Sequence, residues 1–252
     1  MALDAGPDRP PFLMWRLCDA LRAKWALRDA GVAQQDAQAR QAAAERALGD
    51  PGLGRIAGLT LECFNPDLLR VQLGHDNPHT LICDWIAAIA DRPEGDYHRG
   101  PPVALYLYWP GKGTGKTHLA AGATLALRAA GRLAVFVEES SYLSALWSAP
   151  MEGSERLYQL PGDLAHITAI DDIGRLPPGK GPGNGTEKAW YNVINRRWLR
   201  RRWTIFTSNR TLDELLAQCT IDDATYSRMA QMMGGADRLV LVEGDDQRLR
   251  RS

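Results

Sequence analysis

The sequence predicts a parallel α/β sheet built around a phosphate-binding loop. Three observations lead to this fold class: a continuous apolar run at 103–109, a glycine-rich segment directly after it, and an apolar run at 167–170 that ends in two aspartates. Apolar runs without polar alternation are expected for strands that are covered on both faces of a parallel sheet. Strands that alternate with helical patterns along the chain indicate the same architecture.

Each element of this sheet follows from its own pattern. The helix after the glycine-rich segment is expected to end at Gly131, because glycine tolerates the backbone conformation that terminates helices. A basic tail follows the last apolar run. We expect helices at 81–90, 117–130 and 187–200, and strands at 103–109, 133–137, 167–170, 203–207 and 239–242.

Composition limits the possible partners and compartments. The 252 residues include 30 Lys plus Arg and 30 Asp plus Glu, so no global positive field attracts nucleic acid, and any such contact must come from a local cluster. No apolar run approaches the roughly 18 residues that a membrane span requires. The N-terminus carries acids and prolines where a secretory signal would be basic and apolar. We therefore expect a cytoplasmic protein with no membrane partner.

The four cysteines are Cys18, Cys63, Cys83 and Cys219, and none forms a CxxC pair. Structural zinc sites use close cysteine pairs, and disulfide frameworks are typical of small secreted chains. We expect reduced thiols that are mostly buried or partly buried.

The chain divides into residues 1–50, expected to form a helical N-terminal arm, and residues 51–252, expected to form the sheet domain. A helical segment of this kind cannot bury a core alone, so it must pack on its own domain or serve as a docking arm for a partner. The glycine- and proline-rich stretch at 177–185 follows the third strand. It is either a solvated linker or a mobile loop that contacts a substrate.

The glycine-rich segment has the composition of a nucleotide-binding loop. Gly113 and Gly115 permit backbone angles that are closed to other residues, so the amide N–H groups can surround phosphate at a helix N-terminus. Lys116 should reach the β- and γ-phosphates of ATP, and the Thr117 hydroxyl should ligate Mg²⁺. Pro110 stands where the usual pattern has its first glycine. The predicted nucleotide contacts are Gly111, Lys112, Gly113, Thr114, Gly115, Lys116, Thr117 and His118.

Polar residues after two other strands supply the parts that hydrolysis needs. Asp171 ends a strand, where a carboxylate can hold the water shell of Mg²⁺. Asp172 follows in the position of a general base, although glutamate is commoner there. The alternative is that the two carboxylates simply cap a loop. Asn209 follows the next strand, where its amide could contact the γ-phosphate or the attacking water.

Six sequence blocks add to these signals: GTGKTHLAA, IDDIG, INRRW, FTSN, YSRM and GDDQRLR. In this order they resemble the DnaC/DnaI/IstB group of AAA+ ATPases over roughly residues 55–250. This resemblance implies a five-stranded AAA+ sheet of order 5-1-4-3-2 with flanking helices. It assigns Asn209 as sensor 1 and Arg228 as an arginine finger given to a neighbouring subunit in a ring or spiral. It also suggests Arg248 as a second nucleotide-sensing or structural arginine.

The resemblance implies a loader that places a hexameric DnaB-type replicative helicase on single-stranded DNA. ATP binding would drive assembly and DNA binding, and hydrolysis would drive release. The N-terminal arm lacks the cysteine pattern of zinc-binding DnaI-type loaders and looks closer to the all-helical arm of DnaC-type loaders, which grips the helicase. Two alternatives remain open: an IstB-like helper of a transposase that selects target DNA, and an ATP-gated adaptor with weak hydrolysis.

A basic and aromatic cluster at 196–203 is a candidate contact for single-stranded DNA. It holds five arginines and two tryptophans within eight residues. Arginine matches phosphate with its forked donors, and aromatic rings can stack on unpaired bases. The alternatives are that its tryptophans belong to the core and that its arginines lie at subunit interfaces. The predicted DNA contacts are Arg196, Arg197, Arg200 and Arg201.

Overall fold

The computed structural model describes residues 56–71, 76–90, 103–148, 165–175, 185–236 and 238–246. Three predicted features lie outside these ranges: the N-terminal arm, residues 177–184 of the glycine- and proline-rich stretch, and Arg248. Short 3₁₀ turns at Leu61–Cys63 (η1) and Pro66–Leu68 (η2) precede the sheet.

Five parallel strands form one sheet in the order β2-β3-β4-β1-β5. Read from the opposite edge, this is the order 5-1-4-3-2, so the prediction is confirmed. The strands β1 to β4 are largely buried, as parallel strands with helices on both faces must be, whereas only Val240 of the edge strand β5 is buried. The strands are β1 (Ala104–Tyr108), β2 (Ala134–Glu138), β3 (Ile167–Asp171), β4 (Trp203–Ser208) and β5 (Val240–Leu241).

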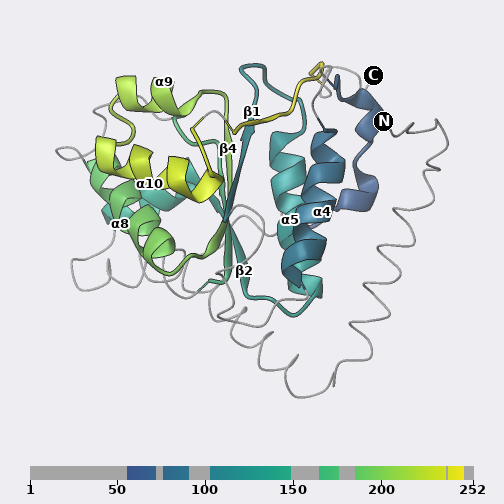
Figure 1. The fold of residues 1–252 in the computed structure, drawn as a ribbon, viewed down its shortest axis with the longest axis horizontal. Helices are drawn as coiled ribbons and strands as arrows, with labels where there is room; N and C mark the ends of the chain where they lie inside the picture. Colours follow the sequence, from purple (N-terminus) through teal and green to yellow (C-terminus); the bar gives the residue numbers. More distant parts are fainter. Residues whose placement is uncertain are drawn as a thin grey trace, which may run out of the picture.

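Helices cover both faces of the sheet (Figure 1). On one face lie α4 (Pro78–Ala90) and α5 (Lys116–Ala129), and on the other lie α8 (Gly185–Leu199), α9 (Leu212–Ala217) and α10 (Asp223–Met233). The helix α6 (Glu139–Ser148) follows β2 directly. None of the helices in the described ranges is long and apolar enough to span a bilayer.

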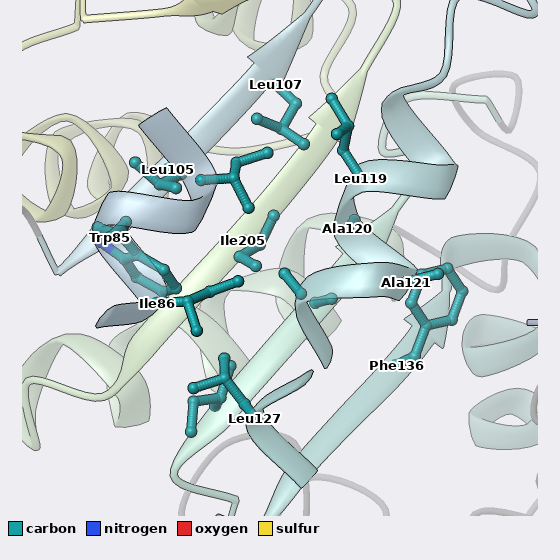
Figure 2. Packing of buried hydrophobic residues seen from close by; sticks show 14 of the residues in the cluster. Trp85, Ile86, Leu105, Leu107, Leu119, Ala120, Ala121, Leu127, Phe136 and Ile205 are labelled. Atoms are coloured by element: carbon teal, nitrogen blue, oxygen red, sulfur yellow. The ribbon is translucent and has the colours of Figure 1, made fainter. Parts of the chain in front are cut away.

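Alternating strand residues supply two separate cores. On β1, Leu105 and Leu107 face α4 and α5, whereas Tyr106 joins the core beneath α8 and α10. Figure 2 shows the first of these cores, in which Trp85 of α4 and Leu119 of α5 pack toward β1 and β4. Helices packed on both faces of the sheet thus hold β1 and α5, and the glycine-rich loop lies between them at the carboxyl end of β1.

Local signals define the two helices that follow β4. Thr211 and Glu214 form a reciprocal capping box at the start of α9. Asp222 caps the N-terminus of α10, and Gly234 ends that helix in the left-handed conformation at φ 82°. The predicted helix and strand positions differ from the observed bounds by a few residues at most, but α6, α9 and α10 were not predicted.

The expectation for the cysteines is only partly correct. Cys63, Cys83 and Cys219 are free thiols. Cys63 and Cys219 are exposed, whereas Cys83 is partly buried, so the expected burial is wrong for two of the three cysteines in the described ranges.

Candidate nucleotide site

The glycine-rich loop connects the end of β1 to the first turn of α5. Gly113 and Gly115 have φ values of 71° and 102°, a region that residues with a Cβ rarely adopt. Gly115 precedes the helix and provides no side-chain cap. The first amide N–H groups of α5 are therefore available to an anion, as the sequence predicted for a phosphate loop.

Lys116 is held by the loop itself. Its Nζ donates to the backbone oxygens of Trp109 at 2.9 Å and Gly111 at 2.8 Å, and the side chain is buried. These bonds close the loop around the ammonium group. A phosphate anion brought to the loop would find this positive charge already in place.

Asp171 lies at the end of β3, beside the first turn of α5. It accepts hydrogen bonds from Thr117 Oγ1 at 3.2 Å and from Thr207 Oγ1 at 2.6 Å. Burial raises the pKa of Asp171 to about 6, and the nearby charge of Asp172 adds to the rise, while the hydrogen bonds from both threonines oppose it. A cation beside this carboxylate would favour its ionised form.

This arrangement fits Mg²⁺. The hydroxyl of Thr117 and the carboxylate of Asp171 are hard oxygen donors, which Mg²⁺ prefers, and they lie within 3.2 Å of each other. Magnesium ions at ATP sites commonly use one or two protein ligands and complete their shell with water and phosphate. The two residues predicted to hold the metal are therefore brought together.

Asp172 and Asn209 also meet at this edge. Asn209 Nδ2 donates to Asp172 Oδ1 at 3.4 Å, and Arg175 Nη1 donates to Asp172 Oδ2 at 3.3 Å. The same Arg175 nitrogen lies 3.2 Å from Glu138 Oε1. Asp172 has a left-handed backbone at φ 61°, a conformation that residues other than glycine adopt uncommonly.

Two supporting residues were missed by the sequence reasoning. Thr207 contacts Asp171 through its hydroxyl, and the same oxygen accepts the amide hydrogen of Asp172 at 2.9 Å. Glu139 is fully buried and accepts from the amides of Gly174 at 3.1 Å and Arg175 at 2.8 Å. The signal for Thr207 was present in the FTSN block, whereas the role of Glu139 depends on contacts distant in sequence.

Arg228 lies on α10 and contacts two aromatic rings of α8. Its guanidinium carbon is 4.9 Å from the ring centre of Tyr191 and 5.4 Å from that of Trp198. These distances are within the range of cation–π attraction. Trp198 also donates from Nε1 to Gln231 Oε1 at 2.9 Å, which ties α8 to α10.

His118, which is predicted to contact nucleotide, has partners elsewhere in the structure. His118 Nε2 lies 2.8 Å from the backbone oxygen of Thr60, and its ring meets Phe64 edge to face. The side chain of His118 thus faces the segment that contains η1. Lys112 is exposed at the tip of the loop.

The prediction that Arg197 contacts DNA is wrong. Arg197 is fully buried, and its Nε donates to Thr204 Oγ1 at 2.7 Å. Its remaining nitrogens donate to the backbone oxygens of Ala165, His166 and Trp203. These bonds join α8 to the starts of β3 and β4. The guanidinium is therefore inaccessible to DNA. Arg200 and Arg201 are exposed and Arg196 is partly buried.

Solved structures with a similar fold come from replication proteins. No protein-family model and no curated relative matches this chain. The crystal structure of the DnaC helicase loader is similar with a TM-score of 0.53 and 14% identity, covering 76% of this chain and 99% of that one. DnaA from Aquifex aeolicus bound to AMPPCP has a TM-score of 0.53 and 21% identity, covering 74% of this chain and 50% of that one.

A further DnaA structure, bound to AMPPCP and single-stranded DNA, has a TM-score of 0.55 and 21% identity and covers 75% of this chain. The match spans half the length of each of these DnaA chains. At these identities the likeness concerns the fold. The chain has the AAA+ P-loop fold, with its five-stranded parallel sheet and flanking helices.

Proposed function

We propose that this chain is an ATPase that loads a replicative helicase onto single-stranded DNA. The observation that carries the proposal is the meeting of the Lys116 loop, the Thr117–Asp171 pair and the Asp172–Asn209 pair at one edge of the sheet. The similarity in fold to the DnaC helicase loader covers 99% of that chain and 76% of this one, and it supports a loader rather than another AAA+ function.

The loop residues would bind the phosphates of ATP. Amide N–H groups from Gly111 to Thr117 provide the cradle, and Lys116 supplies the charge for the β- and γ-phosphates. Thr117 and Asp171 would hold Mg²⁺, which neutralises charge on the phosphates when it is bound. Deep burial of Asp171 strengthens this interaction, because a carboxylate with few water partners gains more from a cation.

Asp172 is the proposed general base, and Asn209 the residue that orients the attacking water. Their side chains already lie within 3.4 Å of each other. Arg175 also contacts Asp172, so the carboxylate must exchange the Arg175 contact for the water. The exposed position of Arg175 makes this exchange feasible, because exposed ion pairs contribute little free energy.

Arg228 is proposed to act as an arginine finger in the site of a neighbouring subunit. The side chain would have to leave Tyr191 and Trp198, at a cost of roughly 1 kcal/mol for each cation–π contact. Mixing Lys116→Ala subunits with Arg228→Ala subunits tests this role, because each variant supplies what the other lacks. Partial recovery of ATP turnover is expected in the mixture, and no recovery would remove Arg228 from this role.

The remaining assignments rest on the sequence. We propose that residues 1–50 dock on the DnaB-type helicase, that residues 51–252 form the ATPase domain, and that Arg248 senses nucleotide. Arg196, Arg200 and Arg201 are the proposed contacts for single-stranded DNA. The protein is proposed to work in the cytoplasm as a ring or spiral of subunits.

Affinity purification from cognate cell extract with ATP, followed by mass spectrometry, tests the partner. Recovery of the replicative helicase by the full chain, but not by a variant without residues 1–50, is the expected result. A Lys116→Ala variant serves as the control for dependence on ATP. Recovery of a transposase without helicase would contradict the loader and indicate a transposition helper.

An ATP-gated adaptor with weak hydrolysis is a second candidate. Two features of the chain favour it: Pro110 replaces a loop glycine, and Asp172 is engaged by Arg175. Turnover that Arg228→Ala abolishes would exclude this adaptor. Nucleotide binding without turnover in the assembled protein would favour it.

A further inference from the structure

The last described residues cross back over the sheet edge as a strap, defined here as residues 242–246. The amide of Val242 donates to the backbone oxygen of Tyr108 at 2.9 Å, which continues the pairing of β5 with β1. Gly244 then forms an antiparallel bridge with Leu69. The strap is therefore attached both to the end of β1 and to the segment that precedes α4.

Arg70 strengthens this attachment with two contacts. Its amide donates to the backbone oxygen of Glu243 at 2.9 Å, and its guanidinium lies 2.6 Å from Asp245 Oδ1. A Cβ at Gly244 would lie only 3.0 Å from the backbone oxygen of Leu68, so the two backbones approach closely there. These contacts fix the direction in which the strap leaves Gly244.

The strap ends with a carboxylate against the phosphate loop. A Cβ placed on Gly113 would lie 1.8 Å from Oδ1 and 2.3 Å from Cγ of Asp246. No residue other than glycine could therefore occupy position 113 with Asp246 in this place. The carboxylate of Asp246, which lies far from Gly113 in the sequence, fills the space that a side chain at position 113 would need.

A carboxylate and a phosphate group compete for such a position. Glycine-rich loops with successive amide N–H groups attract anions of either kind, and the N-terminus of α5 adds its positive dipole end. A carboxylate beside Gly113 and a phosphate held by the neighbouring amide N–H groups would repel each other. Nucleotide binding would therefore be favoured by movement of Asp246 away from the loop.

We propose that Asp246 is a built-in competitor of the nucleotide, so that ATP binding displaces the strap from the phosphate loop. This inference rests on the proposed ATP site and adds a form of regulation to it. The nucleotide-free domain holds its own anion at Gly113, and its apparent affinity for ATP is lowered by the fraction of molecules in which the strap is in place. The backbone contacts of Val242, Gly244 and Arg70 hold the strap in place, and the exposed pair of Arg70 and Asp245 adds a small contribution.

Calorimetric titration of the full chain with Mg·ATP tests the proposal. Asp246→Asn should bind ATP roughly three- to tenfold more tightly than the wild type, because the competing charge is gone. Arg70→Ala should tighten binding in the same direction by a smaller factor, since it only loosens the strap. Asp84→Asn, the same change on the exposed surface of α4, is the matched control and should leave the affinity unchanged.

The outcomes separate the strap from the ATP site. Equal or weaker binding by Asp246→Asn, with a wild type that binds ATP, overturns the strap and leaves the ATP site intact. If Asp246→Asn binds ATP and the wild type does not, the strap blocks the site completely, which supports the proposal. No binding by either protein overturns both.

Hydrogen exchange of the wild type provides a readout that needs no substitution. Addition of Mg·ATP should speed amide exchange at Val242 and Arg70, whose amides are bonded in the strap contacts. Slower exchange at both amides would show that ATP tightens the strap and would overturn the proposal.

Discussion

The hydroxyl of Thr207 links both acidic residues of the candidate site. It donates to Asp171 Oδ1 at 2.6 Å and accepts the amide hydrogen of Asp172 at 2.9 Å. The neighbouring register pairs Ile170 of β3 with Phe206 of β4, which sets Thr207 level with the end of β3. One β4 side chain thus fixes the position of the acidic pair.

Replacement of Thr207 by valine should impair both stability and turnover. The change leaves the partly buried amide of Asp172 and the buried carboxylate of Asp171 short of a partner, which costs about 1–3 kcal/mol of unfolding free energy. Loss of the Thr207 hydrogen bond also raises the pKa of Asp171 further, since that bond lowers it. Urea unfolding and ATPase assays measure the two effects. Thr207→Ser keeps the hydroxyl and should stay close to the wild type; a serine variant as weak as the valine one would contradict this account.

Asp171→Asn should stabilise the protein in the absence of metal and nucleotide while abolishing Mg²⁺-dependent turnover. The pKa of Asp171 is raised from 3.8 to about 6, so ionisation of the folded protein at neutral pH costs on the order of 3 kcal/mol. Asparagine keeps one acceptor oxygen for the Thr207 hydroxyl, and its amide nitrogen can donate to the oxygen of Thr117. Thermal melts with a chelator at pH 7.5 should show a higher Tm for the variant.

The pH dependence of this gain has a defined sign. A folded-state pKa above the unfolded value means that the folded protein binds more protons between about pH 4 and 6, so wild-type stability falls as the pH rises through this window. Below about pH 4 the carboxyl is protonated in both states. The advantage of Asp171→Asn should therefore be full above pH 6 and shrink toward zero below pH 4. A constant difference across this range would argue against burial as the cause.

Glu139 should prove essential to the turn after β3. Its carboxylate accepts from the amides of Gly174 and Arg175 and from Trp190 Nε1 at 3.1 Å. Glu139→Ala leaves these donors without that acceptor in a buried site and should lower the unfolding free energy by about 3 kcal/mol or more. Glu139→Gln retains one acceptor oxygen and should lose less. Chemical denaturation gives the order, and equal losses would show that the one acceptor oxygen retained by glutamine contributes nothing by itself.

Arg197 should behave as a structural residue. Removing a buried, fully hydrogen-bonded guanidinium leaves several carbonyl groups unsatisfied, and Arg197→Ala should cost about 3–5 kcal/mol. Arg200→Ala, on the exposed end of the same segment, should change stability by about 0.5 kcal/mol or less. Paired measurements of unfolding and of single-stranded DNA binding distinguish the two positions. Loss of DNA affinity without loss of stability in Arg197→Ala would contradict the buried role.

The sheet and the phosphate loop were predictable because their signals are local. The apolar run at 103–109 became β1, and the glycines at 113 and 115 adopt the positive φ values that the loop requires. Asp171 and Asp172 were placed correctly because a polar residue at the end of an apolar strand must lie at the carboxyl edge of a parallel sheet. The strand order came from the family resemblance.

The rest depended on contacts between distant segments. The α10 sequence is polar on average, although its buried residues follow helical spacing, and its capping by Asp222 and Gly234 was a further local signal that the sequence analysis did not use. Arg197 belongs to a run of arginines that looks solvent-exposed in the sequence. Its burial depends on backbone oxygens of β4 and of the residues before β3, which the sequence does not place beside it. No sequence pattern links Asp246 to Gly113, although both belong to blocks that resemble the family.

Magnesium-dependent ATP hydrolysis by the full chain, compared between the wild type and Lys116→Ala, tests the central claim most directly. The claim predicts turnover in the wild type, none in Lys116→Ala, and retained nucleotide binding with lost turnover in Asp172→Asn. Equal turnover in the wild type and Lys116→Ala would contradict it, because the phosphate loop could not then be the site of the reaction.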